Sequence, residues 1–357
     1  MFFDSLLRRP LIGLDIGVSG IKAVEIHHGH QCRLIAYNRV PLPWNSIQLD
    51  GDIKDRQALV EALKRLFRNG VFSSKKVVTG ISGNSVMTKK ITVPKMSEKE
   101  LSHQLYFEAE QYLPFNIQDV NLDFAILGPT TTTGSTAMMD VLLVAAKKDY
   151  VRSVTSLVEE AGLVPAIIDT QAFALGNAFE FNYSHLTDHA LGAANVIVDF
   201  GAGSTKLSVV EADKTVFARE FAQCGIGCTQ RLAEKMAIQL PEAERLKIAQ
   251  STSPFVKPAI AEYVAEWVEE IVRTLDFFVS QSSERTLTGI YVCGGASQTD
   301  GLIQALESKV SAPVQPFNPI QNLAGSGKKM NAQAIREISF LGAVAVGLSL
   351  REPGDCQ

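Results

Sequence analysis

The sequence predicts an α/β protein of two lobes, each built around a mixed β-sheet that contains the same strand–turn–strand hairpin. Three observations predict this fold. The chain has 357 residues, of which 46% are hydrophobic, and a single domain usually takes only roughly 100 to 200 residues. One glycine-rich pattern near the start occurs again in the middle of the chain. Between the two copies lies a segment with its own strand and helix signals, which predicts a small inserted α+β subdomain.

The two copies of the glycine-rich pattern share both residues and spacing. The first is Asp15-Ile-Gly-Val-Ser-Gly-Ile-Lys22, and the second is Asp199-Phe-Gly-Ala-Gly-Ser-Thr-Lys206. In each copy, a glycine follows the aspartate by two positions and a lysine follows it by seven. Apolar residues precede both copies and alternate with polar ones after them. Each copy therefore predicts a strand, a tight turn and a second strand.

The residue types of this repeat suit a polyphosphate and its metal ion. The glycines permit a positive φ and let the backbone approach a ligand, and successive amide groups can hold an anion. Hydroxyl groups add donors, and lysines add positive charge. These candidate phosphate ligands are Gly17, Ser19, Lys22, Gly201, Gly203, Ser204, Thr205 and Lys206. At the strand ends, Asp15 and Asp199 are placed to hold Mg²⁺ through water.

A single hairpin of this kind is most often an ordinary glycine-rich turn. Two copies at identical spacing favour a clamp that holds one polyphosphate between two lobes.

Three further segments supply candidates for the rest of a nucleotide site. Gly294 and Gly295 follow a predicted strand and would let a base or ribose approach the backbone. Glu244 and Lys247 lie one turn apart on a predicted helix, where they form either an exposed ion pair or contacts to a ribose and purine. Gln171 lies near the start of another predicted helix and either caps it or positions a water at the terminal phosphate.

Two predicted helices are rich in alanine and glycine. They span 165–181 and 338–350, and each places small residues one turn apart on one face. Such faces allow two helices to cross closely, which predicts a crossing pair at a hinge between the lobes. Asp169 is expected either to cap the first of these helices or to contact a metal-bound water.

The inserted subdomain is expected to have the order β-α-β-β-α. Its first helix begins with a capping box, Ser97-Glu-Lys-Glu100, and its last helix ends at Gly162. The expected elements are strands over 86–93, 120–127 and 138–145 and helices over 97–112 and 148–162.

The expected domain boundaries follow from this order of elements. We expect a first lobe over 1–190 that carries the insert over about 84–165. A second lobe is expected over 191–337. A C-terminal helix within 338–357 is expected to return to the first lobe.

Composition excludes several classes of function. The net charge of −4 and the charged content of 20% lack the basic excess of a nucleic-acid-binding protein. The five cysteines have no metal-ligand spacing and are expected to be reduced thiols in a cytoplasmic protein. The longest apolar run, 338–350, is too short to cross a bilayer. The N-terminal segment, 1–10, is expected to be a frayed or packed chain terminus. The alternative is a short segment that docks on a membrane surface or a partner protein.

Taken in order, these segments resemble the phosphate-1, connect-1, phosphate-2, adenosine and connect-2 motifs of the actin, heat-shock chaperone and sugar-kinase superfamily. The resemblance implies an actin-like ATPase fold that binds ATP and Mg²⁺. It implies a nucleotide site made of Asp15, Gly17, Ser19, Lys22, Asp199, Gly201, Gly203, Ser204, Thr205, Lys206, Glu244, Lys247, Gly294 and Gly295. Gln171 corresponds to the water-positioning residue.

Within this superfamily, the chain looks like the PilM family of type IV pilus assembly. The resemblance rests on IGLDIGVSGIKAVEI, MSEKELSHQLYFEAEQYLPF and ISFLGAVAVGL. It implies an adaptor at the cytoplasmic face of the inner membrane that grips the N-terminal peptide of PilN in a groove beside the insert. The more distant FtsA proteins end in an amphipathic membrane helix, whereas this sequence ends in REPGDCQ.

The expected chemistry is slow ATP hydrolysis or none, because no acidic residue replaces Gln171. The helix from Ser97 to Tyr112 is a candidate wall of the peptide groove. It carries Tyr106, Phe107 and Tyr112, which are more aromatic side chains than a single buried helix face requires. At least two of these aromatic side chains are expected to be core. The alternatives are an FtsA-like filament-forming ATPase and a small-molecule kinase in which Asp169 is the base.

Overall fold

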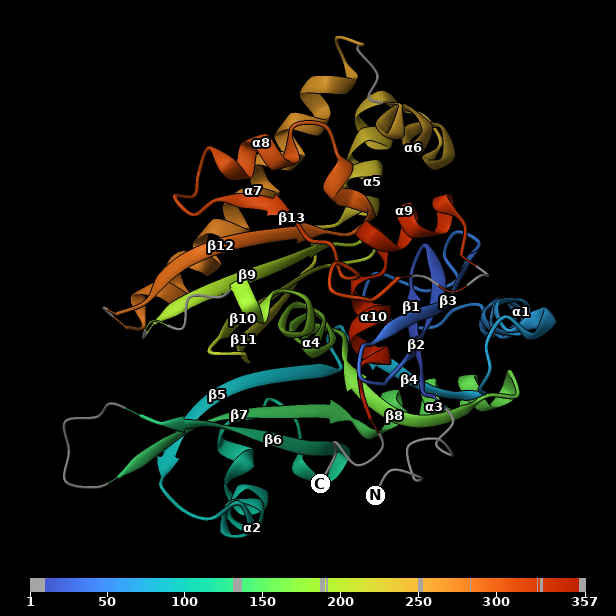
Figure 1. Ribbon diagram of the computed structural model, residues 1–357. Helices are drawn as coiled ribbons and strands as arrows, with labels where there is room; N and C mark the ends of the chain where they lie inside the picture. The colour runs from blue at the N-terminus through green and yellow to red at the C-terminus, as the bar shows by residue number, and fades with distance from the viewer. Residues whose placement is uncertain are drawn as a thin grey trace.

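Two five-stranded sheets form the two lobes (Figure 1). The computed structural model describes residues 10–130, 137–186, 190, 192–249, 253–282, 284–325, 327 and 330–352. The first sheet contains β1 (Ile12–Gly17), β2 (Gly20–His27), β3 (Arg33–Pro41), β4 (Lys76–Ile81) and β8 (Val164–Thr170). The second contains β9 (Ala193–Phe200), β10 (Thr205–Glu211), β11 (Lys214–Phe221), β12 (Thr286–Cys293) and β13 (Val314–Pro316).

The two sheets have the same topology. Their strand orders are β3-β2-β1-β4-β8 and β11-β10-β9-β12-β13. In both, the first three strands pair antiparallel and the last two add in parallel. The sequence repeat therefore marks β1–β2 in one sheet and β9–β10 in the other, and the predicted fold class of duplicated mixed sheets is confirmed.

Helices cover both sheets. The first lobe has α1 (Arg56–Leu66) and α3 (Lys148–Glu160), and the second has α5 (Gly225–Met236), α6 (Leu240–Ile248), α7 (Val256–Ser280) and α8 (Leu302–Glu307). Short 3₁₀ helices lie at η1 (Arg68–Gly70), η2 (Ala109–Gln111), η3 (Ile117–Asp119), η4 (Ser184–Leu186) and η5 (Gly295–Gln298). In the second lobe, the buried face of α7 places Trp267 against Phe200 of β9, with ring centroids 5.3 Å apart. That contact fixes the strand that leads into the second hairpin.

Two helices cross between the two sheets. These are α4 (Gln171–Tyr183) and α10 (Ala343–Ser349), and their contact confirms the predicted close crossing. A Cβ on Gly347 would lie 1.7 Å from the carbonyl oxygen of Ala174, so only glycine allows this approach. On its other side α10 meets β1, where a Cβ on Gly13 would lie 2.0 Å from the carbonyl oxygen of Ala345.

The expected boundaries of these two helices were wrong. The first begins at Gln171 because residues up to Thr170 pair with β4 as strand β8. Its cap is Thr170, whose side chain accepts a hydrogen bond from the Phe173 amide, and not Asp169. The second is two helices, α9 (Ala332–Leu341) and α10, which meet at Gly342.

The insert is a three-stranded antiparallel sheet with one helix. It contains β5 (Val86–Pro94), α2 (Glu98–Glu108), β6 (Val120–Pro129) and β7 (Met138–Lys147), in the strand order β5-β7-β6. The capping box of α2 is confirmed, because Ser97 and Glu100 each accept a hydrogen bond from the other's backbone amide. Leu101 and Leu105 of α2 pack into the core of this sheet. The threonine-rich turn lies largely outside the described residues.

The last helix of the expected insert, α3, packs on both sheets. Leu157 and Val158 of α3 share a core with Leu59 and Leu63 of α1. On its other side, Val154 of α3 packs with Ala146 of β7 in the sheet of the insert. Within the described ranges, the structure shows no helix with the length and apolarity that a bilayer span requires.

Candidate functional site

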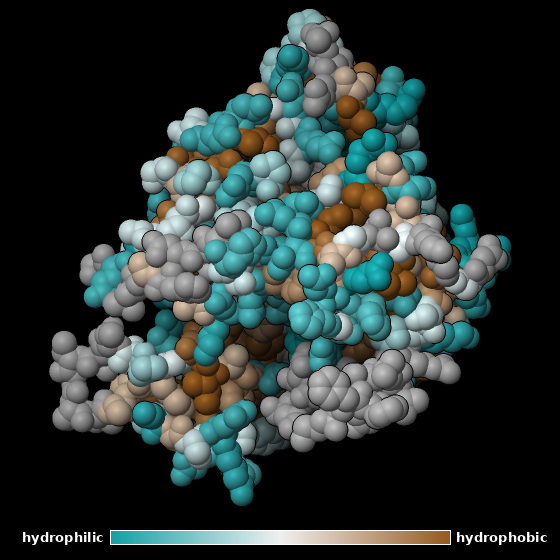
Figure 2. All heavy atoms as spheres, in the orientation of Figure 1, coloured by the Kyte–Doolittle hydropathy of each residue, from teal (hydrophilic) through white to brown (hydrophobic). Residues whose placement is uncertain are grey.

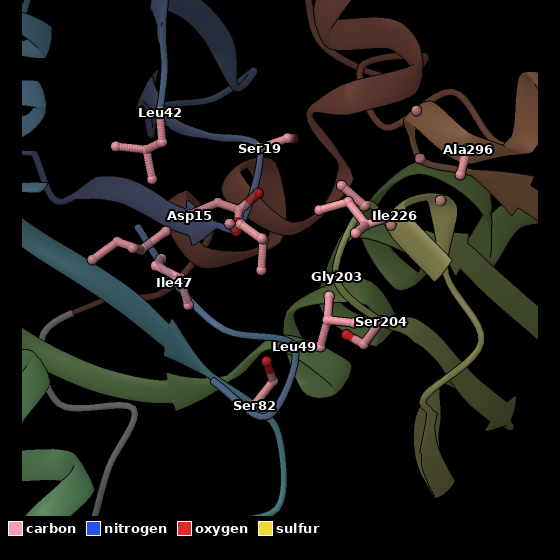
Figure 3. A pocket seen from close by; sticks show the side chains of 18 of the residues that line it. Asp15, Ser19, Leu42, Ile47, Leu49, Ser82, Gly203, Ser204, Ile226 and Ala296 are labelled. Carbon is pink, nitrogen blue, oxygen red and sulfur yellow. The ribbon is translucent and has the colours of Figure 1, made fainter. Parts of the chain in front are cut away.

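A cleft of about 1060 Å³ lies between the two lobes. Both hairpins, α5, α6 and the turn after β12 line it. Its volume is at the upper end of the range for cofactor sites, roughly 300 to 1,000 Å³. Figure 3 shows Asp15 and Ser19 of the first hairpin facing Gly203 and Ser204 of the second across this space.

The first hairpin holds its own ion pair. Asp15 and Lys22 lie opposite each other in the register of β1 and β2. The Lys22 Nζ donates to Asp15 Oδ2 at 2.6 Å, and both side chains are largely buried. The Asp15 carboxylate is therefore fixed at the cleft wall by a partner from the same hairpin.

The second hairpin arranges the same residue types differently. Asp199 and Lys206 are again opposite in register, but the Lys206 Nζ donates to Ser204 Oγ at 3.0 Å. Burial raises the pKa of Asp199, against the opposing effect of Lys206 and Lys22, and Asp15 raises it further. Charges from both hairpins thus act on one carboxylate, because the two lobes bring them to the same place.

The glycines of the hairpins allow the backbone and the opposite hairpin to approach closely. The expected positive φ was wrong, since Gly17, Gly201 and Gly203 all lie outside the left-handed region. A Cβ on Gly201 would lie 2.5 Å from the Ser204 carbonyl oxygen. A Cβ on Gly203 would lie 2.3 Å from Val18 Cγ2 of the opposite hairpin. The absence of a side chain lets the two hairpins touch across the cleft.

Gly294 places the backbone directly against Asp199. Its φ of +86° favours glycine, and a Cβ there would lie 2.3 Å from Asp199 Oδ1. Its amide donates to the Phe340 carbonyl oxygen at 2.8 Å, which ties this turn to α9. Gly295 also lines the cleft and has more space, because its Cβ position is 3.4 Å from Leu341 Cδ2.

Glu244 and Lys247 form a buried network at the cleft wall. The Lys247 Nζ donates to the Gly225 carbonyl oxygen and to Thr229 Oγ1, both at 2.8 Å. It also pairs with Glu244 Oε2 at 2.7 Å, and Lys247 is only 9% exposed. The alternative of a fully exposed ion pair is therefore wrong, and both residues line the cleft.

Gln171 and Asp169 lie on different sides of the same turn. Gln171 lines the cleft, and its Nε2 donates to the Gly80 carbonyl oxygen at 3.4 Å. Asp169 is not part of the cleft wall, and its Oδ2 accepts from Arg351 Nη1 at 2.8 Å. Burial raises the pKa of Asp169, and the Arg351 guanidinium opposes that shift. The structure thus provides Asp169 with a partner near the end of the described chain.

Thr205 is the one predicted nucleotide ligand that the structure places away from the cleft. Its Oγ1 donates to the Gln223 carbonyl oxygen at 2.7 Å and accepts from Trp267 Nε1 at 2.8 Å. The side chain is fully buried. Its hydroxyl therefore links the hairpin to the residues packed behind it. Every other predicted nucleotide-binding residue lines the cleft.

Several lining residues carry no signal in the sequence. Their elements are brought to the cleft by folding, and none belongs to the repeated pattern. They include Arg39, Trp44, Tyr150, Glu220, Ile226, Gln230 and Gln298.

The described residues contain no preformed cluster of three or more metal-ligating side chains. Four cysteines, Cys32, Cys224, Cys228 and Cys293, are free in the described residues. Cys356 and the N-terminal segment 1–9 lie outside the described residues.

Two sheets of one topology, a hairpin from each at the cleft and crossing helices at the hinge define an actin-like ATPase fold. A family model described as type IV pilus assembly protein PilM matches residues 13–353. A solved structure, described as a PilM-PilN type IV pilus biogenesis complex, is 31% identical with a TM-score of 0.83. The match covers 96% of this chain and 98% of that one. The chain belongs to the PilM family of type IV pilus assembly proteins.

More distant structures share the fold alone. The ethanolamine utilization protein EutJ from Carboxydothermus hydrogenoformans is 14% identical, with a TM-score of 0.54, over 96% of this chain and 90% of that chain. MreB 5 of Spiroplasma citri bound to AMPPNP is 12% identical, with a TM-score of 0.50, over 95% and 94%.

Proposed function

We propose that this protein is an ATP-binding adaptor of the type IV pilus assembly platform at the cytoplasmic face of the inner membrane. It binds Mg-ATP in the cleft and the N-terminal cytoplasmic peptide of PilN beside the insert. The observation that carries the nucleotide proposal is the meeting of two copies of one hairpin, from two separate sheets, across a single cleft.

The residues at the cleft fit a magnesium polyphosphate. Lys22 and Lys206 supply positive charge for the phosphates, and Ser19 and Ser204 supply hydroxyl donors. Asp15 and Asp199 are oxygen ligands of the kind that Mg²⁺ prefers, and they reach the ion through its waters. The turn at Gly294 and the network of Lys247 hold the base and ribose.

The proposed adaptor hydrolyses ATP slowly or not at all. Gln171 is the polar residue at the start of α4, and its neutral amide can orient a water but cannot take its proton. A kinase would need a carboxylate near the transferred phosphate. The candidate for that role, Asp169, is paired with Arg351 outside the cleft wall, which disfavours the kinase alternative.

The partner proposal rests on family membership and on the insert. The similar solved structure is described as a PilM-PilN complex. Tyr106 on α2 is 56% exposed, whereas α2 ends at Glu108, before Tyr112. Tyr112 follows η2 and is partly buried against the core of the insert. The side chain of Phe107 lies outside the described residues. Tyr106 is therefore the aromatic residue of this helix that we place at the peptide groove.

Two aspartate variants test the nucleotide site. Asp15→Ala and Asp199→Ala should each abolish measurable Mg-ATP binding in a calorimetric titration, because each removes a carboxylate that holds the metal through its waters. The matched control is Asp149→Ala on α3, whose side chain is 96% exposed, and it should bind like the wild type. Unchanged affinity in both cleft variants, with folding verified by circular dichroism, would disprove the site.

A peptide titration tests the partner. A synthetic N-terminal PilN peptide from the same organism should bind saturably to the full chain, and a peptide of scrambled sequence should not. Tyr106→Ala should weaken binding, since an exposed aromatic anchor often contributes more than about 1 kcal/mol. Equal binding of the native and scrambled peptides would refute this part of the proposal.

A further inference from the structure

The insert contacts the second lobe along the edge strand β11. Figure 1 shows β5 of the insert running below β10 and β11. Thr88 Oγ1 on β5 donates to the Ala218 carbonyl oxygen at 3.2 Å, and the Lys214 Nζ donates to the Ile126 carbonyl oxygen at 3.4 Å. In Figure 2, hydrophobic atoms gather in the recess between these two parts of the molecule. Two edge strands from different subdomains therefore meet at one seam.

Glu220 lies where this seam reaches the nucleotide cleft. It is on β11, opposite Lys206 of the second hairpin in register, and it lines the cleft. Its Oε2 accepts a hydrogen bond of 2.6 Å from the amide of Gly83. Gly83 lies between β4 and β5, at the point where the chain leaves the first sheet for the insert. This bond joins the second lobe to the base of the insert, in addition to the bonds of Thr88 and Lys214 along the seam.

The Gly83 amide is held in place by its surroundings. Its φ is +89°, and a Cβ there would lie 3.1 Å from the Asp50 carbonyl oxygen. The neighbouring Ser82 backbone hydrogen-bonds with Tyr150 of α3. Burial, together with the Glu220 carboxylate, raises the pKa of Tyr150 to about 12. An acceptor with full negative charge makes the Glu220 bond stronger than a neutral one.

Glu220 also acts electrostatically on the metal-binding side of the cleft. Burial is the main cause of the raised pKa of Asp199, and the Glu220 carboxylate adds to it. A bound magnesium polyphosphate must change the charge that Glu220 faces. The same side chain therefore lines the cleft and contacts the base of the insert.

From this geometry we propose that Glu220 is a positioning residue that couples nucleotide occupancy of the cleft to the placement of the insert. The proposal rests on the proposed nucleotide and peptide binding. A nucleotide that contacts both hairpins stabilises the observed arrangement of the lobes, and the Glu220–Gly83 bond joins the second lobe to the insert in that same arrangement. Both interactions thus favour one state, in which the insert is fixed as a wall of the peptide groove. Linkage then requires nucleotide and peptide to strengthen each other's binding equally.

The test measures peptide affinity with and without Mg-ATP in four proteins. In the wild type, Mg-ATP should tighten peptide binding by a factor in the range of roughly 5 to 150. Glu220→Ala should bring this factor towards one, and Glu220→Gln, which keeps an acceptor without the charge, should give an intermediate factor. The control is Arg219→Ala, because Arg219 is the next residue on β11 and faces Glu270 at 3.4 Å. It should retain the wild-type factor.

Hydrogen exchange separates this inference from the proposed function. Without any ligand, amides over 82–94 should exchange faster in Glu220→Ala than in the wild type or in Arg219→Ala. If these amides exchange in Glu220→Ala at the wild-type rate, Glu220 does not hold the insert, and the inference is overturned whether or not nucleotide binds. Faster exchange with an unchanged coupling factor would show a structural contact only and would overturn the coupling role. Failure of the wild type to bind Mg-ATP would refute the proposed function, while the exchange result would still decide whether Glu220 holds the insert.

Discussion

The two hairpins have one sequence pattern but different electrostatics. In the first, Lys22 neutralises Asp15 directly at 2.6 Å. In the second, Lys206 turns to Ser204, and Asp199 lies against the backbone of Gly294. The first carboxylate is thus held by a partner within its own hairpin, whereas the second is held by packing from β12 and by charges from both lobes.

The two hairpins also differ in what lies behind them. Behind β9 and β10, the long helix α7 supplies Trp267, which binds Thr205 and packs on Phe200. Behind β1, the short helix α10 lies close to Gly13. A repeated sequence pattern therefore specifies the backbone hairpin, while the surroundings of each copy determine which groups its carboxylate contacts.

The largest expected effect is at Gly294. Gly294→Ala places a side chain at a positive φ and 2.3 Å from Asp199 Oδ1, so we expect a loss of roughly 3 kcal/mol or more in the free energy of unfolding. Gly295→Ala is the matched control, because its Cβ position is 3.4 Å from the nearest atom, and it should cost less than about 1 kcal/mol. Urea denaturation measures both. Equal stabilities would contradict the packing account of Asp199.

An intermediate effect should distinguish the glycines of the two hairpins. A Cβ on Gly201 would lie 2.5 Å from the Ser204 carbonyl oxygen, whereas one on Gly17 would lie 3.3 Å from the Gly20 carbonyl oxygen. We expect Gly201→Ala to cost about 1 to 3 kcal/mol of stability, and Gly17→Ala to cost less. Thermal unfolding of the two variants, each also titrated with Mg-ATP, would show the order, and a greater loss in Gly17→Ala would reverse the comparison.

The smallest effect concerns the pH dependence of Mg-nucleotide binding. Lys206, and after it Lys22, opposes the rise in the pKa of Asp199 that burial causes. The ionised carboxylate attracts Mg²⁺, so binding weakens as pH falls through this pKa. Without a lysine the pKa rises further, and the loss of affinity should begin at higher pH in Lys206→Met than in Lys22→Met.

The apo proteins provide a second readout for the lysines. Lys22→Met leaves the buried Asp15 carboxylate without its ion-pair partner, which should cost roughly 1 to 3 kcal/mol in stability. Lys206→Met removes a bond to a serine hydroxyl and should cost less. Calorimetric titrations over a series of pH values and urea denaturation would measure the two effects. Identical pH profiles for both variants would show that Asp199 does not respond to its own lysine.

Much of this protein was determined by its sequence alone. The spacing of aspartate, glycine and lysine predicted both hairpins because a tight turn with close backbone approach needs those residues locally. The capping box of α2 was predictable for the same reason, since Ser97 and Glu100 satisfy each other's backbone amides. These features depend on residues within one turn of each other.

The tertiary structure decided the features that join distant segments. Asp169 pairs with Arg351, Thr205 with Trp267, and Glu220 with Gly83. Asp169 and Thr205 are buried polar groups that must find a partner, and in all three pairs the partner depends on how helices and sheets pack. A repeated pattern along the chain could therefore reveal the phosphate clamp, but only the packing of the two lobes and the insert determined which charges face it.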